Sequence, residues 1–149
     1  MRKIKYRAIR KSIPNGPFVY GDVLSYTPIG DPMISSRNEI QFKTSTPSFI
    51  TCVPNTESEF IGLHDKAHKE IFDGDIVKDV IDDGDDIIVC YMQIFWNNDI
   101  AAFVYDSSAS KDKSSYEFLT KEWCSEVLVV GNIHDGITYN DYTYKNCKC

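Results

Sequence analysis

The sequence contains no apolar run of about 18 residues, the length that a membrane-spanning helix needs. The basic start Met1-Arg2-Lys3-Ile4-Lys5 is not followed by the continuous apolar segment of a secretory signal peptide. These absences exclude the usual sequence signals for insertion or export. We therefore expect a cytoplasmic protein with no membrane partner.

Motifs for covalent chemistry or phosphate binding are also missing. There is no Gly-x-Ser-x-Gly segment and no glycine-rich phosphate loop, and Cys124 beside Trp123 suits a packed thiol as well as a nucleophile. The five cysteines are an odd number without paired spacing, and Cys147 and Cys149 supply only two of the four ligands of a structural zinc site. We predict no catalytic residue, no cofactor and no metal.

What is present indicates a soluble, sheet-rich domain. The chain has 149 residues, of which 42% are hydrophobic and 26% charged, enough for one core without disulfides. Aromatic residues make up 13%, and they accompany many Ile and Val residues with no long stretch of helical period. This usage favours β-strands.

Charge is unevenly distributed along the chain. The net charge is −6, yet residues 1–11 carry six cations and no acid, whereas residues 57–86 hold eleven acids and three lysines. The first strand therefore offers a candidate nucleic-acid patch, made of Arg2, Lys3, Lys5 and Arg7. Because most of the surface would repel phosphate, the charge distribution disfavours a nucleic-acid partner. The two charged regions are expected to attract each other, within the chain or between subunits.

Alternation and turn residues place most of the strands. Residues 3–10 alternate as a half-buried strand, the turn residues of 13–17 follow, and 18–20 is extended again, so a first hairpin is predicted. Residues 21–37 have no sustained period and are predicted as a loop, followed by short strands at 39–43 and 48–53.

A second hairpin is predicted in the middle of the chain. Residues 75–81 and 87–96 read as strands joined by the acidic turn 82–86, and 101–105 returns as the partner of the long apolar strand. The remaining predictions are a loop at 106–115, a helical turn within 116–124 and a final strand at 126–130.

Residues 64–75 carry two candidate sites. Asp73 and Asp75 could form a carboxylate pair for acid/base or metal chemistry, but Gly74-Asp75-Ile76-Val77 is also the pattern of a turn that launches a strand. His64 and His68 have the i, i+4 spacing of metal ligands on a helix, in a segment that does not favour a helix. We predict structural turns with exposed histidines.

Three segments together resemble the YopX family of phage and prophage proteins. They are Ile61-Gly62-Leu63-His64-Asp65-Lys66, Lys69-Glu70-Ile71-Phe72-Asp73-Gly74-Asp75-Ile76-Val77 and Val130-Gly131-Asn132-Ile133, and the start at Arg2 to Ala8 is similar too. The motif residues, to which we assign a structural role, are Gly62, Leu63, Asp65, Gly74, Asp75, Ile76, Val77, Gly131 and Asn132. Ala67-His68 stands where the family usually has Asn-Gly, and Gly136 to Tyr139 replaces the usual helix start.

The resemblance implies a small, mainly β protein with an SH3-like barrel, encoded by a phage or prophage and without an assigned function. Combined with the strand pattern, it predicts one domain over residues 1–149. Residues 1–56 would form an added N-terminal strand and hairpin region, 57–133 the barrel, and 134–149 a C-terminal tail. The expected barrel core contains Ile76, Val77, Val89, Tyr91, Ile94 and Phe103.

Three function classes follow. The leading prediction is a non-enzymatic accessory protein that acts through an unknown protein partner, with homo-oligomers formed through edge strands. The first alternative is a small barrel that binds nucleic acid through its basic N-terminal strand. The second is a metal-dependent hydrolase or nuclease that uses Asp73, Asp75 and a histidine.

Overall fold

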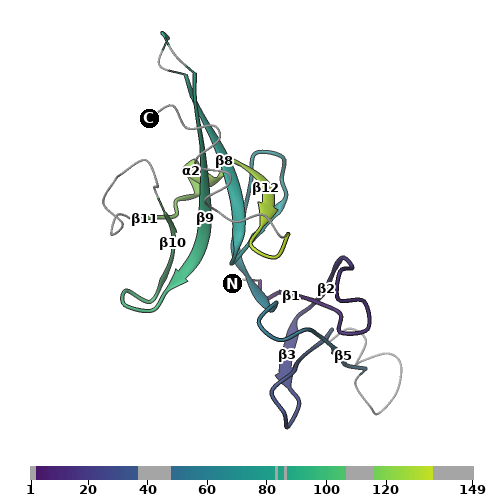
Figure 1. Ribbon diagram of the computed structural model, residues 1–149. Coiled ribbons are helices and arrows are strands. Elements are labelled where there is room, and N and C mark those ends of the chain that lie inside the picture. The colour runs from purple at the N-terminus through teal and green to yellow at the C-terminus, as the bar shows by residue number, and fades with distance from the viewer. Residues whose placement is uncertain (1–2, 37–47, 83, 86, 107–115, 136–149) are drawn as a thin grey trace. The chain divides into compact units, whose positions relative to one another are not determined.

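The structure is a computed structural model, and it describes residues 3–36, 48–82, 84–85, 87–106 and 116–135 (Figure 1). Among these residues antiparallel strands predominate, as the sequence predicted, and a single short helix is present. The chain divides into two compact units, residues 1–60 and 61–149. The sequence placed the equivalent boundary after residue 56, and the expectation of one domain over the whole chain stays a prediction.

The first unit contains two small antiparallel arrangements. Strands β1 (Tyr6–Ile9) and β2 (Phe18–Gly21) form the predicted hairpin, and β1 also pairs with the beginning of β6 (Ser58–His64). The second arrangement is a three-stranded sheet in the order β3-β4-β5. Its strands are β3 (Val23–Tyr26), β4 (Pro32–Ser35) and β5 (Ile50–Thr51).

The loop predicted for residues 21–37 is wrong, because most of this segment is the β3–β4 hairpin. The turn that joins the strands depends on Gly30, which has a φ of +92°, and on the Thr27 hydroxyl, which accepts a hydrogen bond from the Asp31 N–H at 3.0 Å. Pro32 is tolerated because it is the first residue of its strand. The prolines and glycine that obscured the strand period therefore belong to the turn and its exit.

A small core holds the first unit together. Ala8, Ile34 and Cys52 are its fully buried members, and partly buried side chains from four strands pack against them. Gly21 permits the close approach of β2 and β4, since a Cβ at this position would lie 2.3 Å from the backbone oxygen of Ser35. The predicted strand at 39–43 lies outside the described residues.

The second unit is built on a five-stranded sheet in the order β11-β10-β9-β8-β12. Its strands are β8 (Asp75–Asp82), β9 (Ile87–Asn97), β10 (Ala102–Asp106), β11 (Tyr116–Phe118) and β12 (Leu128–Asn132). The predicted hairpins of β8 with β9 and of β9 with β10 are both present. The end of β6, the short β7 (Glu70–Phe72) and helix α2 (Lys121–Cys124) complete the unit.

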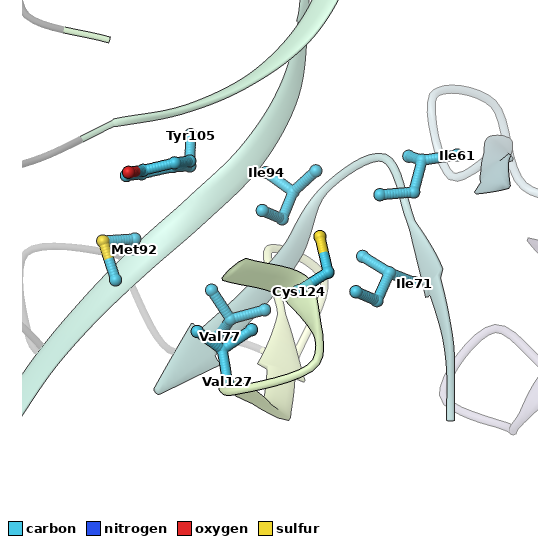
Figure 2. Packing of buried hydrophobic residues seen from close by; sticks show 8 residues of the cluster. All are labelled: Ile61, Ile71, Val77, Met92, Ile94, Tyr105, Cys124 and Val127. Carbon is cyan, nitrogen blue, oxygen red and sulfur yellow. The ribbon is translucent and has the colours of Figure 1, made fainter. Parts of the chain in front are cut away.

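The core of the second unit lies on one face of this sheet (Figure 2). Its buried members come from six elements and their connections, and they are Ile61, Ile71, Val77, Met92, Ile94, Tyr105, Cys124 and Val127. Of the expected core residues, Ile76, Val77 and Ile94 are fully buried, whereas Val89, Tyr91 and Phe103 are only partly buried. Helix α2 is a single turn, and the Thr120 hydroxyl caps it by accepting the Trp123 N–H at 3.1 Å.

The SH3-like barrel expected from the family resemblance is not found, since the described residues form no closed barrel. The sheet stays open, with β11 at one edge and β12 at the other. The sheet does not close because β11 and β12, which stand at the two ends of its strand order, do not pair with each other.

Candidate interaction surface

The outer halves of β8 and β9 form a two-stranded arm. We define the arm as Asp79–Asp82 and Ile87–Cys90, which pair from Asp79↔Cys90 to Asp82↔Ile87. On one side β12 pairs with β8 only as far as Lys78, and on the other β10 pairs with β9 only from Ile94 onward. In the described residues no third strand flanks the arm, and Figure 1 shows the β8–β9 ribbon continuing past both neighbours.

The arm exposes three large apolar side chains. Val80 is 52% exposed, Ile81 48% and Ile87 69%. The register pairs Val80 with Val89 and Asp82 with Ile87, so Val80, Ile87 and Val89 lie on one face of the ribbon together with Asp82, whereas Ile81 lies on the other face. Contiguous apolar residues on a protein surface mark interaction sites more often than isolated ones do. The arm therefore combines exposed apolar side chains with two backbone edges that no other strand of the described residues pairs with.

Acidic residues surround this apolar face. The segment from Lys78 to Tyr91 contains five aspartates and one lysine, a net charge of −4. At the end of the arm, the Asp82 carboxylate accepts the N–H of Gly84 at 2.9 Å, and Gly84 adopts a φ of +91°. The exposed Asp82 and Asp85 carry their charge at the tip. The surface thus presents an apolar ribbon that ends in a concentrated negative charge.

The family-motif residue Asp65 connects distant parts of the second unit. It is 4% exposed, and its Oδ1 accepts the N–H groups of Ala67 and Lys69, both at 2.8 Å. Its Oδ2 accepts the N–H of Val129 at 2.9 Å. One carboxylate thereby holds the turn after β6 and the strand β12.

The structure shows how the turn forms with Ala67-His68 where the family usually has Asn-Gly. His68 adopts a φ of +63° and donates its N–H to the Asp65 carbonyl at 2.9 Å, while Ala67 is not at positive φ. A single left-handed residue is enough here because the Asp65 side chain holds the rest of the turn. His64 and His68 are both exposed, as expected, and the segment between them is a turn rather than a helix.

The second motif segment also forms turns. Asp75 is 1% exposed, and its Oδ2 accepts the N–H of Phe72 at 2.9 Å across the turn that contains Gly74. Gly74 has a φ of +84°, donates its N–H to Ile94 and accepts the N–H of Ile133. These contacts fix where β8 begins beside β9 and β12.

The end of β12 is likewise followed by a turn that side-chain hydrogen bonds hold in place. The register between β8 and β12 shifts between Val129 and Gly131, which marks a bulge. After the bulge, the side-chain nitrogen of Asn132 donates to the Asp135 carboxylate at 3.0 Å. The side-chain oxygen of Asn132 accepts the backbone N–H of His134 at 2.8 Å. The motif residues of this segment therefore hold a strand and its turn in place.

The hydrolase hypothesis gains no support from this geometry. Within the described ranges, no group of three or more His, Cys, Asp or Glu side chains is placed to hold a metal ion. Asp75 is buried and occupied with a backbone N–H, so it is not available to solvent. Asp73 and Asp75 belong to one turn.

The proposed nucleic-acid patch is divided by the fold. Arg7 is 4% exposed, and its guanidinium carbon lies 4.2 Å from the centre of the Phe18 ring on β2. Lys5 lies over the ring of Tyr20, with its Nζ 5.1 Å from the ring centre. Lys3 and Lys5 help to line a shallow surface hollow of about 280 Å³, and Arg2 lies outside the described residues. Burial removes Arg7 from the surface on which phosphates could be contacted.

Two buried side chains of the second unit, Tyr105 and Cys124, have a raised pKa. Burial, together with a 2.7 Å hydrogen bond from the Tyr105 hydroxyl to Glu117 Oε2, raises the pKa of Tyr105 well above its ordinary value. Tyr105 also stacks on Trp123, with ring centres 3.9 Å apart. Burial raises the pKa of the Cys124 thiol to about 11. An uncharged thiol is a poor nucleophile, so Cys124 suits a packing role.

The arm is the feature that sequence reasoning missed. The apolar run 87–96 predicts one long strand with Val89 and Tyr91 in the core, whereas the strand begins outside the core with the exposed Ile87 and reaches the core only from Cys90 onward. A signal was present in the acidic turn 82–86, because charged residues of one sign must stay in water and so must the strand ends beside them. The apolar neighbours of such a turn cannot all lie inside.

These observations define the class of the protein: a mainly β chain with open antiparallel sheets, turns held by buried aspartates, and one exposed two-stranded arm. The described residues include no helix of the length and apolarity that crossing a membrane requires. The YopX family, described as YopX protein, matches the chain over residues 5–136. The chain belongs to the YopX family, as the sequence motifs indicated. A search of curated proteins found no match.

Proposed function

We propose that this YopX-family protein is a non-enzymatic accessory protein of a phage or prophage, and that it acts in the host cytoplasm through protein contacts made by the arm. The observation that carries the proposal is the exposure of Val80, Ile81 and Ile87 on a ribbon whose outer edges pair with no other strand of the described residues. Covering the exposed parts of Val80 and Ile87, which share one face, would contribute on the order of 2 kcal/mol. Backbone hydrogen bonds to an open edge would add specificity.

The charge pattern supports a protein partner over a nucleic acid. The arm is acidic, which repels phosphate, and Arg7 is buried in the other unit. Exposed β-branched residues flanked by acids are instead suited to a partner that offers an apolar groove with basic side chains at its rim.

The proposal is tested by removing apolar surface without changing backbone preference. A chain with Val80→Thr and Ile87→Thr keeps β-branched residues at both positions but replaces a methyl group at position 80 and an ethyl group at position 87 with hydroxyls. We expect an unchanged free energy of unfolding and the loss of the complexes that the tagged wild-type chain forms in its host, quantified by native size separation. Ile29→Thr is the matched control, since Ile29 is 83% exposed in a turn far along the sequence from the arm.

Two results would overturn the proposal. One is that the double variant forms the same complexes in the same amount as the wild-type chain. The other is that Ile29→Thr reduces them equally, because the effect would then come from general loss of surface hydrophobicity and not from the arm.

A further inference from the structure

We propose that the partner of the arm is a second copy of this chain, and that the arm of one copy docks on the basic hollow of the first unit of another. The basic hollow is the surface hollow lined by Lys3, Ile4, Lys5 and Tyr20, together with Gly21, Asp22 and Ser36. The inference rests on the proposed function and adds the identity of the partner and of its receiving surface.

The receiving surface has the chemistry that the arm needs. Ile4 is 49% exposed and Tyr20 is 50% exposed, so the hollow offers apolar area to Val80 and Ile87. Lys3 is exposed beside them, and Lys5 lies over the Tyr20 ring and lines the same hollow. Apolar side chains bordered by cations thus face apolar side chains bordered by carboxylates. This is the complementarity that selects partners and speeds their encounter.

The two surfaces carry opposite charge. Of the residues that line the hollow, Lys3, Lys5 and Asp22 are charged, a net charge of +1, whereas residues 78–91 have a net charge of −4. Asp22 at the edge of the hollow lowers the positive charge but does not reverse it. Since the rest of the chain is acidic, the first unit is where a negatively charged arm finds an attractive surface.

The same charges argue against the simplest alternative, in which two arms pack face to face. That arrangement would bring the exposed Asp82 and Asp85 of one copy near those of the other, and like charges across a contact are unfavourable. Docking of arm on hollow uses two different surfaces of the chain. It is therefore a head-to-tail contact, which builds rings or extended assemblies rather than an isolated pair.

Charge reversal on each side tests the inference on the purified full-length chain. Asp82→Lys with Asp85→Lys reverses the arm, and Lys3→Glu with Lys5→Glu reverses the hollow. Sedimentation velocity over a range of protein and salt concentrations is the measurement. We expect the wild-type chain to associate, salt to weaken that association, and each reversed chain to associate at least about tenfold more weakly.

The decisive sample is an equimolar mixture of the two reversed chains, in which a basic arm meets an acidic hollow. We expect the mixture to recover association that neither variant shows alone. Two control variants reverse the same amount of charge at exposed positions elsewhere: Glu122→Lys with Glu126→Lys, and Lys66→Glu with Lys69→Glu. Both controls are expected to associate like the wild-type chain.

A wild-type chain that stays monomeric at all concentrations would overturn the inference, and so would association that either reversal leaves intact or that the mixture fails to restore. If the arm variant Val80→Thr with Ile87→Thr still loses its complexes in the host under those results, the proposed function stands with a different partner. If that variant keeps its complexes, the proposed function fails as well.

Discussion

The side chain of Asp65 and the backbone N–H of Val129 are hydrogen-bonded at 2.9 Å, although 64 residues separate them in the sequence. This bond attaches β12 to the turn that follows β6. Because the same carboxylate also accepts the N–H groups of Ala67 and Lys69, one buried side chain satisfies three backbone donors. The motif that identifies the family is therefore a device for joining elements of the second unit.

Replacing Asp65 tests this role. Asp65→Ala would leave three backbone donors without their acceptor, and we expect the free energy of unfolding to fall by about 3 kcal/mol. Asp65→Asn retains one acceptor oxygen, so its loss should be smaller. The measurement is urea denaturation followed by circular dichroism, with the exposed Asp99→Asn as control. Equal stability of Asp65→Ala and Asp99→Asn would contradict the structure.

Gly21 offers a test of packing in the first unit. A methyl group at this position would lie 2.3 Å from the Ser35 backbone oxygen and 2.6 Å from the Ile34 side chain, so β2 and β4 would have to separate. We expect Gly21→Ala to lower the free energy of unfolding by about 2 kcal/mol, as overpacking does elsewhere. Gly16→Ala is a second packing test, since a methyl group there would lie 2.6 Å from Cγ2 and 3.0 Å from the backbone oxygen of Ile13, and it should also be destabilising. A neutral Gly21→Ala variant would show that the strands do not approach this closely.

The pKa of Tyr105 makes stability depend on alkaline pH. In the unfolded chain this tyrosine ionises near pH 10, whereas burial and the bond to Glu117 keep it neutral to higher pH in the folded chain. The unfolded state therefore releases a proton that the folded state retains, and stability is lost as the pH rises above about 10. We expect the wild-type chain to lose up to about 1.4 kcal/mol per pH unit more than Tyr105→Phe in denaturation series between pH 9 and pH 11.5. Parallel curves for the two chains would contradict the shift.

Cys124 should resist alkylation while the chain is folded. With a pKa of about 11, roughly a thousandth of this thiol is ionised at pH 8, and the side chain is fully buried besides. We expect iodoacetamide to modify Cys124 only after urea denaturation, as followed by peptide mass spectrometry. Cys52 is also fully buried, and burial raises the pKa of its thiol, so it should behave in the same way. Rapid modification of Cys124 in the native chain would show that the core around it opens.

The local structure of the second unit could be predicted because each signal was carried by neighbouring residues. Alternating apolar residues and the turn residues between them located β8, β9 and β10. The β3–β4 hairpin was not predicted because Gly30 and Pro32 are typical loop residues. In the structure Gly30 belongs to the turn of the hairpin, and Pro32 is the first residue of β4. A short strand whose period is interrupted by its own turn leaves little pattern to detect.

The arm and the open sheet could not be predicted for a different reason. Where β8 and β9 stop being covered depends on how far β12 and β10 extend beside them, which is a property of the register. The sequence of residues 87–97 alone does not indicate where β12 and β10 end. The burial of Arg7 is a similar case, since it depends on Phe18 lying across the hairpin and not on the residues beside Arg7.

The central claim, that the arm is the contact surface of this protein, is tested most directly by placing a photo-crosslinking amino acid at position 87 of the full-length chain in its host. The control carries the same amino acid at position 29, which is also strongly exposed. We predict a discrete crosslinked protein product from position 87, its loss when Val80→Thr is added, and no such product from position 29. The absence of a product at position 87, or the same product from both positions, would contradict the claim.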